Sequence, residues 1–331
     1  MKALVTGGGG FLGGAIARQL LARGDQVRSL ARGDYPELSA LGVDQVRGDI
    51  ADRDAVWNAL EGCDVAFHVA AKAGIWGPSA DYYAANVTGT KHILTGCLRS
   101  GVRRLVYTSS PSVVFAGCDM EGVDESAPYP EHFHAPYPQT KAAAEQLVRD
   151  ANSPELATVS LRPHLIWGPG DHHLIPRIIA RAKAGRLRRI GPHNKLIDTV
   201  YIDNAAAAHL LAADRLAPGA PIAGKVYFIS QGEPVPLWDL VNRILAAAGL
   251  PPVTRSVPVG VAHAVGWLCE KAYELLRIQS EPPMTRFLAS ELSTAHWFNI
   301  DAARRDLGYE PTVTMEEGLR RLQESFKRSG V

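Results

Sequence analysis

The stretch "VTGGGGFLGGAIARQLL" (residues 5–21) decides the fold of this chain. It begins inside a short apolar run typical of a buried strand, and it ends in the apolar spacing typical of a helix. Between them, Gly7, Gly10 and Gly13 are spaced as GxxGxxG. Such glycines allow a tight turn and bring backbone N–H groups close to a pyrophosphate, whose charge the helix N-terminus favours. Glycine-rich loops can also be ordinary, but the strand before and the helix after predict a dinucleotide-binding turn.

Short apolar runs and helical patterns continue to alternate through the first half of the chain. Helices are expected at residues 52–60, 86–99 and 140–151, with strands between them. This order predicts an α/β fold, namely a Rossmann doubly wound parallel sheet with helices on both faces. After Gly168 the alternation weakens, and from Pro234 onward prolines and amphipathic helices dominate. We therefore expect a smaller C-terminal substrate-binding cap.

The length of 331 residues also indicates two lobes, because single hydrophobic cores seldom grow that large. Hydrophobic residues make up 46% of the chain, which is enough to bury a sizeable core. The expected dinucleotide-binding domain covers residues 1–165 and is rejoined by about 198–230. Residues 166–197 and 231–331 are expected to form the cap.

The charge balance and the cysteines limit the possible partners and compartments. There are 35 basic and 34 acidic side chains, a net charge of +1, which predicts neither nucleic acid nor an anionic membrane surface as partner. The four cysteines are scattered, as expected of free thiols in the cytoplasm. The N-terminus enters a strand at once, so we expect no signal peptide. The longest apolar run, residues 259–269, is too short to span a bilayer.

The stretch "SLARGDYP" (residues 29–36) indicates which dinucleotide is bound. About 20 residues past the glycine turn, an acidic residue usually holds the adenosine ribose. Here Ala31 and Arg32 occupy that place, and a guanidinium can bind a 2′-phosphate. We therefore expect NADP(H), with Arg28 as a second candidate cation. The alternative is that Arg32 is an ordinary surface arginine.

Two residues after the third strand are candidates for the adenine site. Asp49 can accept a hydrogen bond from the exocyclic amine, and Ile50 can contact the ring. The alternative for Asp49 is that it caps the N-terminus of the helix that follows.

A tyrosine, a lysine and a serine are candidates for the chemistry. Tyr137 and Lys141 are spaced YxxxK at the start of a helix, so both side chains lie on one face. A lysine ammonium beside a phenol lowers the phenol pKa, and the tyrosine can then exchange a proton with a substrate oxygen. Ser110, or less favourably Ser109, ends a strand at the sheet edge where ligands bind. Each pattern alone also fits a surface helix or a satisfied strand end.

These motifs, in this order, resemble the extended short-chain dehydrogenase/reductase family over essentially the whole chain. The matching segments are "VAAKAG", "NVTGTKHIL", "LRPHLIWGPGD", "DTVYIDNAAAAHLLA" and "FNIDAARRDLGYEP". The resemblance implies that Tyr137 is the general acid of carbonyl reduction and that Ser110 holds the substrate oxygen. It implies that Lys141 binds the nicotinamide ribose and lowers the Tyr137 pKa, while Asn86 supports the site. It places further cofactor contacts at Phe11, Leu12, Ala70, Ala71, Pro163 and His164.

The cap is similar to that of the 3β-hydroxysteroid dehydrogenase branch of this family. Within the branch, "RGDYPEL", "AKAGIWG", "YTSSPSV" and "EPPMTRFLA" resemble the bacterial 2-alkyl-3-oxoalkanoate reductases of long-chain olefin biosynthesis. This resemblance implies NADPH-dependent reduction of a long-chain β-keto acid to the 2-alkyl-3-hydroxyalkanoate. It also implies other olefin-pathway enzymes as partners, and a homodimer, since family members are often dimers.

The candidate substrate contacts lie in and near the cap. Trp76 follows the cofactor loop, Ser112 follows Ser110, and Arg177 can meet the substrate carboxylate, as can Lys195 or His193. Each of these cations is otherwise an ordinary surface residue. We expect no metal site, because the adjacent His172 and His173 do not share a helical face.

One apolar stripe in the cap recurs at helical spacing. It has three interpretations: a helix packed on the core, the wall of a pocket for a long substrate, or a shallow peripheral membrane contact. The stripe consists of Val261, Val265, Leu268, Ala272 and Leu275.

Two other functions remain open from the sequence. The first is a sterol or steroid 3β-hydroxy dehydrogenase that oxidises its substrate with NAD. The second is a non-catalytic NADP(H)-binding regulator, against which the intact Tyr137, Lys141 and Ser110 argue.

Overall fold

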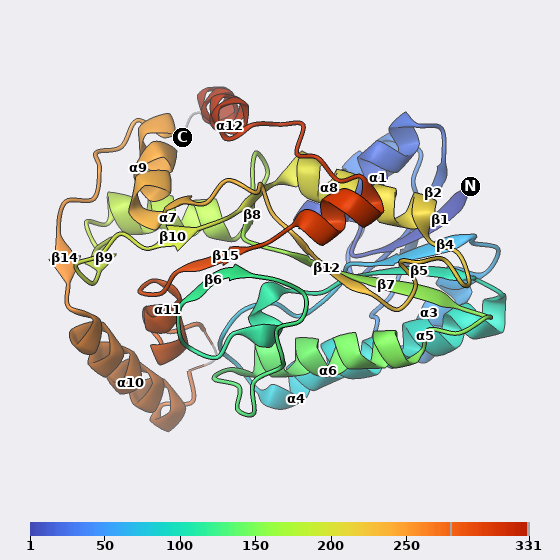
Figure 1. Cartoon of the computed structure of the whole chain (residues 1–331), viewed down its shortest axis with the longest axis horizontal. Coiled ribbons are helices and arrows are strands. Elements are labelled where there is room, and N and C mark those ends of the chain that lie inside the picture. Colours follow the sequence, from blue (N-terminus) through green and yellow to red (C-terminus); the bar gives the residue numbers. More distant parts are fainter. Residues whose placement is uncertain (279, 330–331) are drawn as a thin grey trace.

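A seven-stranded parallel sheet forms the centre of the molecule in the computed structural model, which describes residues 1–278 and 280–329. The strand order β12-β7-β5-β4-β1-β2-β3 reverses between β1 and β4, the doubly wound arrangement that the glycine turn predicts (Figure 1). The strands are β1 (Lys2–Thr6), β2 (Gln26–Ala31), β3 (Asp44–Arg47), β4 (Val65–His68), β5 (Arg104–Thr108), β7 (Ala157–Pro163) and β12 (Val226–Ile229).

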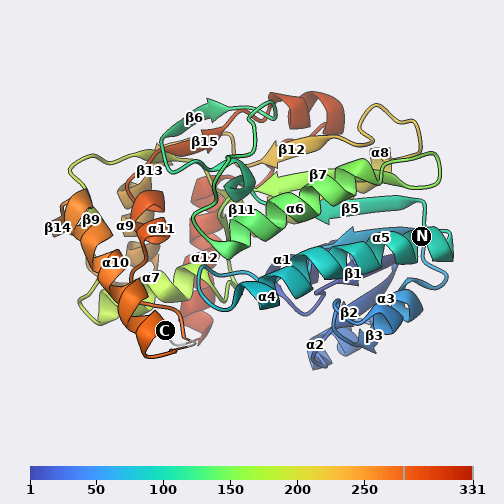
Figure 2. The same cartoon turned by 90° about the horizontal axis from the view of Figure 1, so that it is seen from below.

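Helices cover both faces of this sheet (Figures 1 and 2). On one face α1 (Phe11–Ala22) packs against α8 (Ile202–Arg215), whose buried alanines allow a close approach. On the other face α5 (Gly89–Ser100) lies between α3 (Arg53–Leu60) and α6 (Pro136–Asp150). Short α2 (Pro36–Ala40) follows β2.

The central strand β1 supplies a core to each face. Ala3 and Val5 belong to one hydrophobic cluster and Leu4 to the other, because successive side chains of a strand point to opposite sides. All three side chains are fully buried. This explains why the strand reads as a continuous apolar run rather than an alternating one.

The cap gathers at the end of the molecule away from β3 (Figure 2). Its helices are α7 (Leu174–Lys183), α9 (Leu237–Ala247), α10 (Val259–Leu275) and α11 (Arg286–Glu291), and α12 (Met315–Ser329) packs against α9. Short strands form small sheets in and beside the cap. One sheet has the strand order β13 (Val235–Pro236), β10 (Leu196–Ile197), β15 (His296–Phe298) and β6 (Met120–Val123). Two further pairs are β11 (Val200–Tyr201) with β8 (Ile166–Trp167), and β14 (Ser256–Val257) with β9 (Arg189–Ile190).

The strand β6 comes from the first half of the chain but pairs with β15 beside the cap. The chain therefore passes between the central sheet and the cap more often than the alternation of strand and helix patterns in the sequence predicts. Three short helical segments complete the fold: α4 (Ser79–Tyr82), which continues into the π-helical η1 (Tyr83–Thr88), the 3₁₀ turn η2 (Pro111–Val114), and the π-helical η3 (Ala303–Leu307).

Candidate active site

The glycine turn has the backbone geometry of a pyrophosphate cradle. Gly7 has φ of +70°, and a Cβ there would lie 3.2 Å from the Cα of Ala70. A Cβ on Gly13 would lie 2.2 Å from the Gly7 carbonyl oxygen, so only glycine fits at that position. The N-cap of α1 is Gly10, which has no side chain to occupy the first helical amides. These amides can bind a phosphate, so the residues present fit a dinucleotide.

Arg32 lies at the expected 2′-phosphate position, immediately after β2. Its side chain is exposed, and within residues 1–278 and 280–329 it has no hydrogen-bond or ion-pair partner. Arg28 does not share this position, because its guanidinium donates to Asp44 and to the carbonyl oxygens of Ala59 and Glu61. The candidate for phosphate binding is therefore Arg32 rather than Arg28.

Three residues near Arg32 were missed by the sequence reasoning: Tyr35, Gln45 and Arg47. The Tyr35 ring covers Gly9, where an added Cβ would lie 2.2 Å from ring carbon Cε2. Gln45 holds Tyr35 in place with hydrogen bonds to its N–H and C=O of 3.0 and 2.9 Å. Arg47 ends β3 in register with Ala31 and adds a second exposed cation, which forms a 3.8 Å ion pair with the exposed Asp34. The aromatic residue three positions after Arg32 was the feature of the sequence that could have indicated this contact.

The structure separates the roles of Asp49 and Asp52. Asp49 is exposed, and its carboxylate accepts a local hydrogen bond, 2.9 Å long, from the N–H of Ala51. The N-cap of α3 is Asp52, which accepts from the N–H groups of Asp54 and Ala55. The alternative interpretation of Asp49 as this helix cap is therefore wrong. Ile50 is buried beside Gly89.

Tyr137 and Ser110 meet at the carboxyl edge of the sheet. Tyr137 lies in the first turn of α6, and Ser110 follows β5 as the N-cap of η2. Desolvation raises the pKa of Tyr137, and the nearby Ser110 hydroxyl opposes this in part. The Ser112 hydroxyl lies 2.9 Å from that of Ser110.

Lys141 lies one helical turn beyond Tyr137 and is almost fully buried. Its Nζ donates a 2.6 Å hydrogen bond to the carbonyl oxygen of Thr108 and lies 4.2 Å from the centre of the Tyr107 ring. Burial lowers the pKa of Lys141 to about 7, and Glu145 acts in the opposite direction. Desolvation raises the pKa of Tyr137 in this structure, so its lowering by Lys141 stays a prediction.

Asn86 connects the loop after β4 to the helix that carries Tyr137. It lies in the π-helical turn η1, a type of distortion frequent at functional sites. Its side-chain oxygen accepts from the N–H of Lys72 at 2.7 Å, and its amide donates to the Lys72 carbonyl and to Thr140 Oγ1. Thr140 in turn donates to the carbonyl of Pro136 at 2.8 Å. Asn86 therefore positions the first turn of α6.

A buried histidine network supports the same loop, and no sequence motif indicated it. Thr6 Oγ1 accepts from the N–H groups of Val69 and Ala70, both at 3.0 Å. His68 bridges Thr6 and Thr90 through its two ring nitrogens, at 3.0 and 2.9 Å. Burial, assisted by the nearby Lys141 charge, lowers the pKa of His68 to about 3. The ring is thus neutral and holds Ala70 against the glycine turn.

Pro163 and His164 end β7 at the same sheet edge. Both are buried, and His164 contacts His296 and Phe298 edge-on, each with ring centres 5.1 Å apart. Burial holds the pKa of His164 well below its ordinary value. The next residue, Leu165, has φ of +44°, a conformation that is uncommon for a bulky residue and that often marks functional sites.

The candidate substrate residues separate into two places. Ser112 lies beside Ser110, whereas Trp76 and Arg177 both contact the segment that follows α10. The Trp76 indole donates to the Ile278 carbonyl at 3.1 Å, and Arg177 forms an ion pair with Glu281. Lys195 is also paired, with Asp119. These pairings weaken the case for either cation as the carboxylate-binding group.

Among the described residues, no group of three or more His, Cys, Asp or Glu side chains could hold a metal ion.

Comparisons with known proteins identify the family and the fold of this chain. Residues 4–259 match the sequence profile of the 3-beta hydroxysteroid dehydrogenase/isomerase family. The chain is 54% identical to a 2-alkyl-3-oxoalkanoate reductase of Stenotrophomonas maltophilia, over 98% of this chain and 99% of that protein. It is 50% identical to a protein of the same name from Shewanella oneidensis, over 98% of this chain and 86% of that one. The solved structure of MoeE5 with UDP-glucose and NAD superimposes with a TM-score of 0.76 at 25% identity, covering all of both chains.

Proposed function

The chain belongs to the 3-beta hydroxysteroid dehydrogenase/isomerase family of NAD(P)-dependent oxidoreductases, and we propose that it reduces a long-chain 2-alkyl-3-oxoalkanoate with NADPH. The product is the corresponding 2-alkyl-3-hydroxyalkanoate. The observation that carries this proposal is the placement of Tyr137 and Ser110 together at the carboxyl edge of the sheet, with Lys141 one helical turn away. The names of the two bacterial relatives support the choice of substrate.

The dinucleotide supplies the hydride when it is bound. We propose that its pyrophosphate lies on the amides of the glycine turn and that Arg32 binds the 2′-phosphate, since no carboxylate follows β2 at the ribose position. Tyr35 and Arg47 complete that end of the site. The proposed cofactor contacts are Gly7, Gly10, Phe11, Leu12, Gly13, Arg32, Asp49, Ile50, Ala70, Ala71, Lys141, Pro163 and His164.

Tyr137 is the proposed general acid. Its raised pKa keeps the phenol protonated at neutral pH, which suits a group that must donate a proton to the substrate oxygen. Ser110 donates a hydrogen bond to the same oxygen as negative charge develops on it. After Tyr137 has given its proton to the substrate oxygen, Lys141, whose pKa is lowered to about 7, can give its ammonium proton to the phenolate and regain one from water.

The wider role follows from the same relatives. We propose that the enzyme acts in the cytoplasm, in olefin biosynthesis, as a homodimer, and beside the other enzymes that supply its keto acid and consume its hydroxy acid.

A direct assay tests this function. Oxidation of NADPH and of NADH is followed at 340 nm with a long-chain 2-alkyl-3-keto acid. We expect turnover with a marked preference for NADPH. A strong preference for NADH would contradict the cofactor proposal, and no turnover with any keto acid would favour the regulator hypothesis.

The description of the family favours one alternative, the oxidation of a 3β-hydroxysteroid with NAD. The same assay run with a 3β-hydroxysteroid and NAD or NADP separates the two. Faster turnover of the steroid than of the keto acid would show that steroid oxidation is the function of this chain.

A further inference from the structure

The apolar stripe of α10 points away from the protein. Val261, Val265, Leu268 and Leu275 are 49%, 44%, 58% and 84% exposed, and Ala272 between them is also exposed. Contiguous exposed apolar surface of this kind marks an interaction site. The stripe therefore neither packs on the core nor lines a pocket, two of the three interpretations that its spacing allowed.

Contacts on the opposite face set this orientation. A Cβ on Gly266 would lie 2.7 Å from the backbone nitrogen of Arg286, so α10 meets α11 there with no room for a side chain. One turn on, the Glu270 carboxylate accepts from the N–H and the Nε of Arg286, both at 2.7 Å. These contacts prevent α10 from rotating to bury its apolar stripe.

Positive charge lies next to this helix. Residues 177–189 include six basic side chains and no acidic one, although the chain as a whole is almost neutral, and of these six Arg177 is paired with Glu281. Arg189 pairs in register with Ser256, directly before α10, and Lys183 and Arg186 are exposed nearby in the chain. The acidic residues of α10 are already neutralised, since Glu270 pairs with Arg286 and Glu274 with Lys271.

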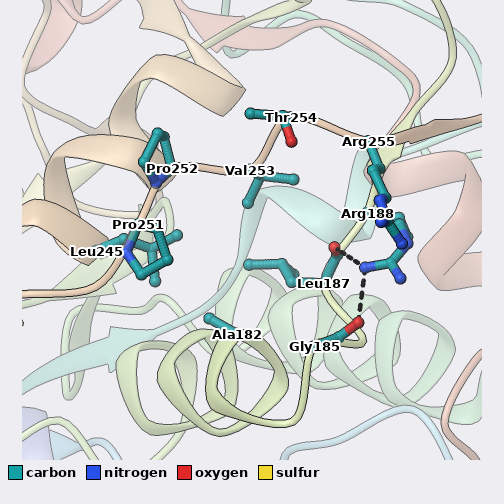
Figure 3. A pocket seen from close by; sticks show the side chains of 10 residues that line it. All are labelled: Ala182, Gly185, Leu187, Arg188, Leu245, Pro251, Pro252, Val253, Thr254 and Arg255. Carbon is teal, nitrogen blue, oxygen red and sulfur yellow. Dashed lines mark hydrogen bonds between the residues drawn. The ribbon is translucent and has the colours of Figure 1, made fainter.

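A hollow of about 240 Å³ lies beside the basic segment (Figure 3). Arg188 and Arg255 stand together at one side of it, and apolar side chains such as Leu187, Leu245 and Pro252 line the rest. Arg255 lies in the segment that leads through β14 into α10. The cationic groups and the apolar stripe are therefore parts of one continuous region of the cap.

We propose that α10 lies on the surface of an anionic lipid bilayer, with its apolar stripe in the acyl boundary and the basic segment at the headgroups. The apolar area that enters the acyl boundary and the attraction of nearby cations to anionic lipid together set how strongly such a surface binds in the plane of a membrane. Trp267 is 47% exposed on the same helix and suits the interfacial layer. No helix among the described residues is long and apolar enough to cross a membrane.

Charge argues against a second copy of this chain as the occupant. A two-fold dimer through α10 would bring the same surface of both subunits together, including both basic segments. Their mutual repulsion is not offset by free acidic groups on α10, because Glu270 and Glu274 are paired.

The C-terminal end of α10 also leads toward the candidate active site. Trp76 donates to the Ile278 carbonyl and contacts the Tyr273 ring edge-on at 6.1 Å. Trp76 belongs to the loop that Asn86 holds against the start of α6. A docked α10 would thus bring lipid close to this loop and allow a long-chain substrate to enter from the bilayer. This last step rests on the proposed function, whereas lipid binding does not.

Vesicle co-sedimentation tests the proposal with the full-length protein. We expect binding to vesicles of equal parts phosphatidylglycerol and phosphatidylcholine, weaker binding to phosphatidylcholine alone, and weakening by salt. The double substitution Leu268→Ser with Leu275→Ser should reduce partitioning by roughly tenfold or more, because two leucines no longer enter the acyl boundary. Leu98→Ser, at a position that is 50% exposed on α5, is the matched control and should bind as the unchanged protein does.

A second pair of substitutions tests the charges. Lys183→Glu with Arg186→Glu should weaken binding to the phosphatidylglycerol vesicles and leave binding to phosphatidylcholine unchanged. Thermal melting verifies that every variant folds. Equal vesicle binding by the leucine variant and the unchanged protein would overturn the proposal. So would a dimer in solution that only the leucine variant disrupts, with no vesicle binding. Keto acid turnover in detergent is measured separately, so its failure does not affect this test.

Discussion

Arg162 and Glu145 form a bidentate ion pair in the interior, with hydrogen bonds of 2.6 and 2.9 Å. Glu145 is 0% and Arg162 is 1% exposed. Tyr129 donates a further 2.6 Å hydrogen bond to the carboxylate. Burial acts to raise the pKa of Glu145, but the hydrogen bonds from Arg162 prevail and hold it below its ordinary value. Glu145 lies one turn beyond Lys141 on α6, so the pair anchors the helix that carries the proposed catalytic groups.

Glu145→Ala should lower the free energy of unfolding by about 3–5 kcal/mol, because it leaves the buried Arg162 charge without its partner. Urea unfolding measures this loss. Glu155→Ala, an exposed acidic position, is the control and should change stability by less than about 0.5 kcal/mol. Replacing both Glu145 and Arg162 by leucine should restore much of the loss. A change below about 1 kcal/mol in Glu145→Ala would show that the pair does not anchor α6.

Tyr137→Phe should lower kcat roughly a hundredfold to ten-thousandfold, because the proton donor is removed while the fold is kept. Ser110→Ala should cost roughly a hundredfold, the usual effect of losing one donor to a developing oxyanion. Steady-state kinetics with NADPH and a keto acid measure both effects. Tyr83→Phe, an exposed tyrosine, is the control. Unchanged turnover in Tyr137→Phe would refute the proposed mechanism.

Arg32→Ala should raise the KM for NADPH roughly tenfold or more, because a charge-assisted contact to the 2′-phosphate is lost. The KM for NADH should stay the same. Arg53→Ala removes an exposed arginine on α3 and should affect neither. Equal effects of Arg32→Ala on both cofactors would mean that the side chain does not reach the phosphate.

Stability should fall as the pH drops below about 6.5. Burial lowers the pKa of His68 to about 3 and of His209 to about 4, so between these values and 6.5 the unfolded chain binds protons that the folded chain does not. Each histidine therefore removes about 1.4 kcal/mol of unfolding free energy per pH unit in that window. His209→Gln should flatten the dependence measured by urea unfolding between pH 5 and 7. A slope that His209→Gln leaves unaltered would exclude this origin.

Local spacing was sufficient to predict the Rossmann sheet and the helices around it. The helix expected at residues 52–60 is α3 (Arg53–Leu60), and the glycine turn lies between β1 and α1 as predicted. These features depend on residues close together in the chain, so the pattern of apolar side chains and glycines is enough to identify them. Two-residue strands such as β9 and β14 carry no such pattern, and the sequence did not indicate them.

The sequence by itself therefore determined the fold, the family and the order of the candidate catalytic groups, because each depends on the spacing of residues close together in the chain. Only the tertiary structure decided which partners those groups have. Arg177 pairs with Glu281, Tyr35 lies on Gly9, and α10 turns its apolar stripe outward. Helical periodicity shows that a stripe exists, but the side that is buried depends on a distant contact, here Gly266 against α11. Such contacts form between residues far apart in the chain. They depend on how the whole chain packs, so no local sequence pattern predicts them.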